Sequence, residues 1–201
     1  MTAGSILLAY HGCDLSTASA VVEKRRTLNP SQNPYDWLGE GIYFWEGSPR
    51  RALRWAEYLR NHTTDGKRKI LKPAVVGAVI ELGNCLDLVD QASLELLREI
   101  YPFFKKTIKT TGARMPQNKG AHEGDKDLLL RYLDCAVINF CHRLREEKNL
   151  DPFDTVRGVF FEGDSLFEGS RIRARTHIQI AVRNPARVRG YFWPTEFQTS
   201  D

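Results

Sequence analysis

The hydrophobic pattern of the first part of the chain predicts two strands and then a helix. Ser5 to Tyr10 is an apolar run that ends at His11-Gly12, and Gly41 to Trp45 is a second short strand. Ser48-Pro49 places a capping serine before a proline, which predicts the start of a helix. Along that helix four apolar residues recur at helical spacing, namely Ala52, Trp55, Ala56 and Leu59.

Helical patterns follow in the middle of the chain and strands return at its end. Ala74 to Leu82 has the alternation of a strand. Helices are expected at Gln91 to Tyr101 and at Asp125 to Glu147, and the lysine-rich stretch Lys105 to Lys126 between them is typical of a surface loop. Three further strands are expected at residues 156–162, 176–183 and 188–193.

Strands at both ends and helices in the middle predict an α+β fold. Neither a repeat nor a Pro/Ser-rich linker divides the chain, so a single domain, 1–201, is expected, with a basic loop insertion at about residues 102–127. The first strand must pair with distant ones, because isolated two-stranded pieces are not stable alone.

Net charge, the lengths of the apolar runs and the spacing of the cysteines limit the classes of protein to which the chain can belong. The net charge of +4 is compatible with an anionic dinucleotide or a nucleic acid as ligand. No apolar run approaches the roughly 18 to 20 residues that a membrane helix needs, and the N-terminus lacks the features of a signal peptide. The four cysteines have no metal-ligand spacing. We therefore expect a cytoplasmic protein with buried free thiols, no metal and no membrane contact.

Three short segments hold residues suited to chemistry. Tyr10-His11-Gly12 places an imidazole at a strand end, beside a glycine that lets a ligand approach the backbone. Asp36 to Glu46 contains two glycines one residue apart, followed by three aromatic residues, but the glycines precede a strand, so a Rossmann interpretation fails. Gln179 interrupts an apolar strand on the same face as His177 and Ala181, and needs partners if it is buried. Taken singly, each segment also has an ordinary structural explanation.

Taken together, these segments resemble the ADP-ribosyltransferase superfamily, specifically its diphtheria-toxin and poly(ADP-ribose) polymerase-like branch with a His-Tyr-Glu triad. Tyr10-His11-Gly12 is similar to the strand-end His-Gly of that branch. Leu38-Gly39-Glu40-Gly41-Ile42-Tyr43-Phe44 resembles its Leu-Gly-x-Gly-Ile-Tyr-Phe segment, the most specific match. His177 to Phe192 is similar to the strand of the catalytic glutamate and the last strand after it, with Gln179 in the glutamate's place. The resemblance implies a split β-sheet core with inserted helices, and NAD⁺ as co-substrate.

The resemblance also implies roles for individual residues. His11 would hydrogen-bond the ribose on the adenosine side, the backbone of Gly12 would hold the nicotinamide carboxamide, and Tyr43 would stack on the nicotinamide ring. Trp55 is the nearest candidate for a second aromatic wall, and Arg51 lies near the place of the family's carboxamide-binding serine. Catalysis would break the nicotinamide–ribose bond through a sugar cation, as in glycoside hydrolysis.

Glutamine at position 179 departs from the triad. It can hydrogen-bond a ribose hydroxyl, but it carries no charge and cannot act as a general base. Transfer of a single ADP-ribose is therefore favoured over polymer elongation. If a carboxylate is still required, Glu162 and Glu168 flank the loop that faces the acceptor in the family. Glu162 is thus a catalytic candidate and Glu168 an acceptor-side one, and both also fit ordinary turn carboxylates.

The same loop contains Arg171, Arg173 and Arg175, whose alternation would line one edge with positive charge. Such an edge suits nucleic-acid contacts or the NAD⁺ pyrophosphate, and solvated loop charges are the ordinary alternative. A compact chain without a fused recognition module resembles bacterial toxin or defence mono-ADP-ribosyltransferases, which modify protein, DNA or RNA. We expect a nucleic-acid acceptor, RNA ahead of DNA. An antitoxin or inhibitor protein is a further partner that this resemblance leaves open.

Three alternative functions stay open. The first is a protein-directed mono-ADP-ribosyltransferase. The second is a non-catalytic NAD⁺ or ADP-ribose binding module, in which loss of the glutamate marks an inactive enzyme. The third is a related-fold transferase that removes an RNA 2′-phosphate with NAD⁺, and the Gly-Ile-Tyr-Phe segment argues against it.

Overall fold

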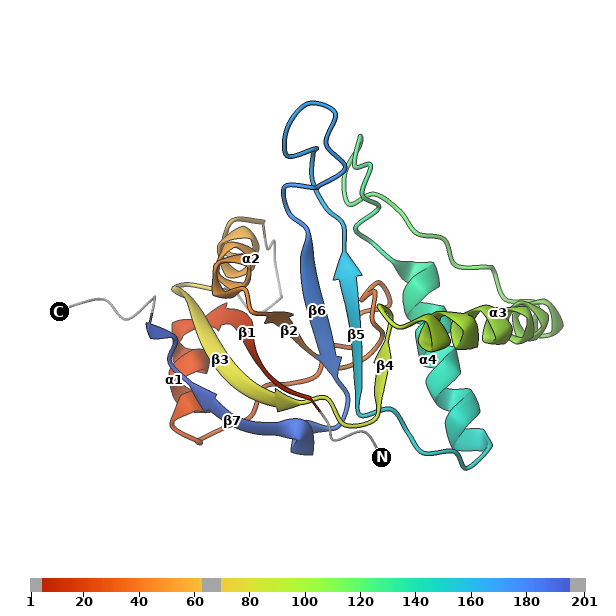
Figure 1. Cartoon of the computed structure of the whole chain (residues 1–201), viewed down its shortest axis with the longest axis horizontal. Coiled ribbons are helices and arrows are strands. Elements are labelled where there is room, and N and C mark those ends of the chain that lie inside the picture. The colour runs from red at the N-terminus through yellow and green to blue at the C-terminus, as the bar shows by residue number, and fades with distance from the viewer. Residues whose placement is uncertain (1–4, 63–69, 196–201) are drawn as a thin grey trace.

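The computed structural model of the chain describes residues 5–62 and 70–195 (Figure 1). Within these ranges it contains four α-helices and seven strands, and the α+β class is confirmed. In chain order they are β1 (Ile6–Asp14), α1 (Leu15–Val22), β2 (Ile42–Glu46), α2 (Pro49–His62), β3 (Pro73–Glu81), β4 (Cys85–Asp87), α3 (Gln91–Thr111), α4 (Tyr132–Glu147), β5 (Thr155–Phe160), β6 (His177–Val182) and β7 (Val188–Phe192), with a 3₁₀ turn at Pro185–Arg187 before β7.

All seven strands belong to one sheet in the order β4-β5-β6-β2-β1-β3-β7. Neighbouring strands are antiparallel except β4 and β5, which are parallel. The first and last strands both pair with β3, so the N-terminal strand has distant partners, as expected. In Figure 1, β1, β3 and β7 curve across one side of the molecule, whereas β4, β5 and β6 stand nearly upright on the other.

The sheet opens at its centre, between β1 and β2. β1 pairs with β3 at every residue from Ile6 to Asp14, but it pairs with β2 at Ala9↔Glu46 and Tyr10↔Trp45 alone. Beyond Tyr10 the two strands part, and the chain continues along β3. His11 and Gly12 therefore lie inside β1 and not at its end, which corrects the strand boundary expected from the apolar run.

Helices cover both faces of the sheet. Ala18 and Val21 of α1 pack with Phe44 and Ile180 in the core on one face. On the other face, Ala52 of α2 packs against Trp45 and Val75. α3 and α4 cover the remainder of that second face, where they pack on Val156 of β5 and on Ala181 of β6, the cross-strand partner of Tyr43.

Two helix boundaries differ from the sequence prediction. α3 continues through Pro102 to Thr111 and ends at Gly112, whose φ of 68° is left-handed, so the expected loop insertion at 102–127 begins as helix. Proline removes one backbone hydrogen bond, and the packing of buried Phe104 on Phe140, with ring centroids 5.5 Å apart, holds the helix beyond it.

α4 begins at Tyr132 and not at Asp125. The Asp125 carboxylate accepts backbone N–H groups from Ala121, Asp127 and Leu129, which closes a turn before the helix. β4 was not predicted, because its three residues give too short a pattern.

Candidate functional site

The three segments that carry the resemblance meet around β2. Trp45 of β2 is the direct cross-strand partner of Gln179 in β6, and Tyr43 pairs with Ala181 two residues further along. The side chains of Tyr43, Trp45 and Gln179 therefore point to the same face of the sheet. His11 approaches β2 from the other side, where Nδ1 of its ring lies 2.7 Å from the backbone oxygen of Tyr43.

His11 crosses the opening between the strands. Because a carbonyl oxygen can only accept, the ring nitrogen that faces Tyr43 carries the proton. Burial lowers the pKa of His11, while the bond to Tyr43 opposes that shift, so the neutral ring is favoured. The ring packs edge-on against Phe44, at 5.8 Å between centroids, and thus leans to the face opposite the Tyr43 phenol. The structure brings the two backbones together but not the two side chains.

Tyr43 is held by the turn that precedes its own strand. Its hydroxyl donates to the Gly39 carbonyl at 2.8 Å and accepts the Leu38 amide at 3.0 Å. Burial raises the pKa of Tyr43 well above its usual value, so the phenol stays protonated and can donate this bond. Gly39 has a φ of 77°, which suits glycine.

Gln179 is fastened to the same turn. Its Oε1 accepts a hydrogen bond of 2.6 Å from the indole Nε1 of Trp37. Glycine at position 158 makes room for that indole, because a side chain there would collide with it. Since the indole can only donate, the amide orientation is fixed, and the NH₂ group of Gln179 is left for another partner. Trp37 lies within the segment Asp36 to Glu46, but the sequence predicts no role for it.

Gly12 has a packing role that the sequence did not reveal. A Cβ at this position would overlap the carbonyl oxygen of Ala52, so α2 lies directly against the β1 backbone. Ala52 and Ala56 are fully buried in this contact. The close approach expected of a ligand at Gly12 is made here by the protein itself.

Charged side chains link three elements at one end of β5 and β6. Arg51 of α2 forms an ion pair of 2.9 Å with Glu162, which follows β5. Glu162 also pairs with Arg175 at 3.1 Å, and Arg175 lies 3.9 Å from Asp127 in the loop before α4. Glu162 is 8% exposed, and burial lowers the pKa of Arg51 while Glu162 opposes that shift. We name these four residues the ion chain; Asp127 was missed by the sequence because it comes from a separate loop.

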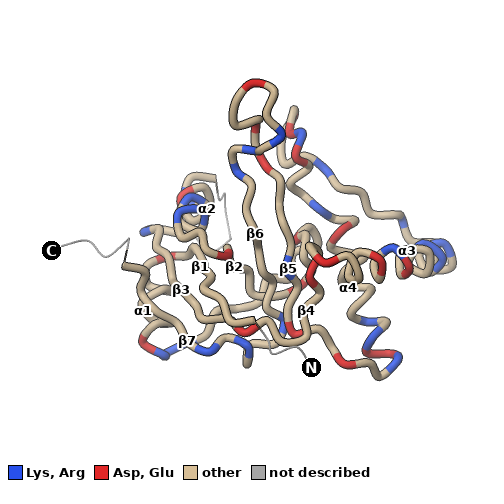
Figure 2. Tube along the Cα trace, viewed as in Figure 1, with Lys and Arg blue, Asp and Glu red and all other residues tan. Residues whose placement is uncertain are grey.

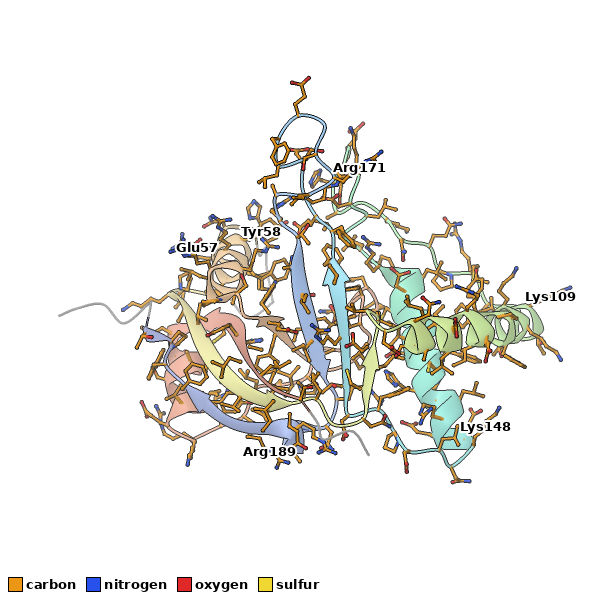
Figure 3. The ribbon with its side chains drawn as sticks, viewed as in Figure 1. Glu57, Tyr58, Lys109, Lys148, Arg171 and Arg189 are labelled. Atoms are coloured by element: carbon orange, nitrogen blue, oxygen red, sulfur yellow. The ribbon has the colours of Figure 1, made fainter. Side chains whose placement is uncertain are left out.

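Contrary to the sequence prediction, the three arginines of the hairpin between β5 and β6 do not line one edge with unpaired positive charge. Arg175 is engaged in the ion chain, and Arg173 donates to the Gly163 carbonyl at 3.2 Å. Among the described residues Arg171 makes no ion pair, and Figure 3 shows it at the hairpin, beyond the sheet. Glu168 is exposed near the tip of the same hairpin.

Aromatic rings surround the ion chain and Gln179. His177 lies between Trp45, at 6.3 Å, and Phe160, at 5.4 Å between centroids. Burial, with Arg51 and Arg175 nearby, lowers the pKa of His177 to about 4, although a bond to the Arg175 carbonyl opposes the shift. Trp55 lies 6.2 Å from Trp45 and is 42% exposed, so it belongs to the surface of α2 and not to its buried face.

Two buried donors beside these rings have no protein acceptor within the described part of the chain. They are Nε1 of Trp45, a residue only 3% exposed, and Nε of Arg51. Burying a donor without a partner costs free energy. A ligand rich in acceptor oxygens would satisfy both.

The thiols, metal ligands and helices of the described residues were also expected to show particular features. All four cysteines are free, and Cys13, Cys135 and Cys141 are buried, as expected. Over residues 5–62 and 70–195, no group of three or more His, Cys, Asp or Glu side chains is arranged to hold a metal ion. No described helix combines the length and the apolar character that crossing a bilayer requires.

Comparison with known proteins finds a curated relative in the archaeon Methanocaldococcus jannaschii, named "Uncharacterized protein MJ0359". The two sequences are 28% identical over an alignment of 203 positions, which covers 92% of this chain and 85% of the relative. Neither a family model nor a solved structure matches the chain.

Proposed function

We propose that the chain transfers a single ADP-ribose from NAD⁺ to a macromolecular acceptor. The observation that carries the proposal is the meeting of three distant segments at the opening of the sheet. Trp45 is paired with Gln179, and His11 bridges to the Tyr43 backbone, in the order that the resemblance to ADP-ribosyltransferases implies.

The buried donors support a dinucleotide ligand. Nε1 of Trp45 and Nε of Arg51 lack acceptors within the described residues, and NAD⁺ offers pyrophosphate, ribose and carboxamide oxygens. His11 keeps Nε2 as an acceptor once Nδ1 is engaged, which suits a ribose hydroxyl. The residues present therefore fit NAD⁺.

The proposed reaction breaks the bond between nicotinamide nitrogen and ribose C1′, and nicotinamide leaves with the bonding electrons. A lone pair of the acceptor forms the new bond to C1′, and the proton of the acceptor passes to solvent. The NH₂ group of Gln179 would hold a ribose oxygen, since its carbonyl is engaged by Trp37. Gln179 cannot remove a proton, so an acceptor that is already nucleophilic and a single transfer are favoured.

Glu162 is better suited to positioning than to proton transfer. Its carboxylate forms ion pairs with both Arg51 and Arg175. Because these pairs engage the lone pairs of the carboxylate oxygens, Glu162 is a poor proton acceptor. We propose that it holds Arg51 toward the NAD⁺ phosphates and orders the hairpin. The acceptor is proposed to be nucleic acid, RNA ahead of DNA, modified in the cytoplasm by a toxin or defence effector.

Labelled NAD⁺ incubated separately with cell protein, RNA and DNA tests the proposal. Label should enter one acceptor with release of nicotinamide. Gln179→Ala should slow transfer at least about tenfold, equivalent to ~1.4 kcal/mol of transition-state stabilisation. Gln91→Ala, an exposed glutamine of α3, is the matched control and should transfer normally.

The bond between Gln179 and Trp37 also favours a second candidate, a binding module that holds NAD⁺ or ADP-ribose without turnover. Binding of NAD⁺ without nicotinamide release from any of the three mixtures would reject the transferase and retain the module. Equal turnover by Gln179→Ala and the wild type would show that this glutamine is structural.

A further inference from the structure

A row of aromatic rings runs from the candidate site to the surface of α2. Trp45 lies 6.2 Å from Trp55 between ring centroids. Trp55 stacks on Tyr58 at 5.6 Å with 16° between the planes, and Tyr58 stacks on His62 at 4.2 Å with 19° between them. The row thus begins at the cross-strand partner of Gln179 and ends at the last described residue of α2.

The outer rings are presented to solvent in a way that core packing does not explain. Trp55 and Tyr58 are 42% and 45% exposed, whereas Ala52 and Ala56 on the neighbouring face are fully buried. Figure 3 shows Tyr58 projecting from α2 at the outside of the molecule. Spacings of three and four residues place Trp55, Tyr58 and His62 on one stripe of the helix.

Two arginines of α2, Arg50 and Arg54, lie beside this stripe. Both are exposed, and among the described residues neither forms an ion pair. Figure 2 shows basic residues gathered along α2. Because α2 carries Glu57 as its only acidic residue, the stripe lies in a positive field.

We propose that this face of α2, made of Trp55, Tyr58, Arg50 and Arg54, binds single-stranded nucleic acid. Unpaired bases present flat faces that stack on aromatic rings, and arginines contact the phosphates. A base paired inside a duplex hides those faces, so the surface selects single strands. The hairpin is a weaker alternative, because two of its three arginines are engaged within the protein.

The inference rests on the proposed function in one respect: the bound strand is taken to be the ADP-ribose acceptor. Arg51, on the same stripe as Trp55, pairs with Glu162 at the inner end of the row. A nucleotide beside Trp55 would therefore lie next to the ion chain and Gln179. This placement delivers an acceptor base or hydroxyl to the site from the α2 side.

Binding is tested without NAD⁺, by fluorescence anisotropy with a labelled single strand of about 12 nucleotides, prepared as RNA and as DNA. The wild-type chain should bind the single strand more tightly than the same sequence as a duplex. Tyr58→Ala and Trp55→Ala should each weaken binding about tenfold. Tyr58→Phe should bind like the wild type, because stacking needs the ring and not the hydroxyl.

The matched controls lie on α3, a second basic helix with an exposed ring. Phe103→Ala removes an exposed aromatic side chain beside Lys105 and should leave binding unchanged. Arg54→Ala should reduce the slope of log affinity against log salt by about 0.7, the value for one phosphate contact to a single strand, whereas Lys109→Ala should not.

Two outcomes overturn the inference: Tyr58→Ala binding as tightly as the wild type, or Phe103→Ala weakening binding as much as Tyr58→Ala. The results that would reject the proposed transferase activity differ from the results that would reject this binding surface. Loss of binding in Tyr58→Ala, with no nicotinamide released by the wild type, retains the surface and rejects the transferase. Nicotinamide release with label on protein, and no affinity for single strands, retains the transferase and rejects the surface.

Discussion

At the scale of single residues, a residue type that suits ligand binding can equally serve packing within the protein. The sequence predicts that Gly12 admits a ligand, yet the atom that approaches it is the carbonyl oxygen of Ala52. Gln179 was expected to need partners, and the partner is Trp37, which is 142 positions away in sequence. A residue type predicts which interactions are needed, but the sequence does not say which neighbour provides them.

Gly12→Ala should destabilise the fold because its methyl group would push α2 away from β1. Overpacking of this kind costs about 1 to 3 kcal/mol of unfolding free energy, and more where the obstacle is backbone. Gly190→Ala in β7 is the control, since a Cβ there meets nothing within 4 Å. Thermal and denaturant unfolding of both variants measure the difference, and equal stability would show that α2 yields without cost.

At the scale of elements, long periodic patterns were predicted well and their ends were not. α2 and β3 occur where hydrophobic spacing and capping residues placed them. α3 passes Pro102 because tertiary packing at Phe104 compensates for a local penalty. The late start of α4 depends on Asp125 accepting three backbone amides, which no periodicity reveals.

The turn at residues 37–39 is the element that the site most depends on, and Tyr43→Phe tests it. The variant keeps the ring but removes the bonds to Gly39 and Leu38. Each buried hydrogen bond contributes about 1 kcal/mol, so a loss of ~1 to 2 kcal/mol of unfolding free energy is expected. Tyr58→Phe on the exposed face of α2 should cost almost nothing. A Tyr43→Phe variant as stable as wild type would mean that the turn is held by its other contacts.

At the scale of the whole molecule, the sequence predicted which segments meet but not what fills the space between them. The strands of His11, Tyr43 and Gln179 are neighbours because β2 lies between β1 and β6 in the sheet, although the His11 ring lies on the face opposite the Tyr43 phenol. The ion chain joins α2, the hairpin and the loop before α4, and the aromatic row joins β2 to α2. These contacts connect elements whose sequence patterns are independent of one another, so only the folded chain shows them.

Buried histidines make the fold sensitive to acid. Burial, with Arg183 and Arg145 nearby, lowers the pKa of His142 to about 3, and both ring nitrogens lack partners among the described residues. The unfolded chain binds a proton near pH 6.5 and the folded chain does so only at much lower pH, so the unfolded state holds more protons between these values. Stability should therefore fall as the pH decreases below about 6.5, by up to ~1.4 kcal/mol per pH unit for each such histidine.

His142→Leu removes this linkage together with two unsatisfied nitrogens. Between pH 7 and pH 5 the variant should lose about 1 to 2 kcal/mol less unfolding free energy than the wild type. His122→Leu, at an exposed position in the loop before α4, should follow the wild-type profile. Urea unfolding at a series of pH values measures all three proteins. If His142→Leu and the wild type lose stability in parallel, then the acid sensitivity lies elsewhere, and His177 between Trp45 and Phe160 is the next histidine to replace.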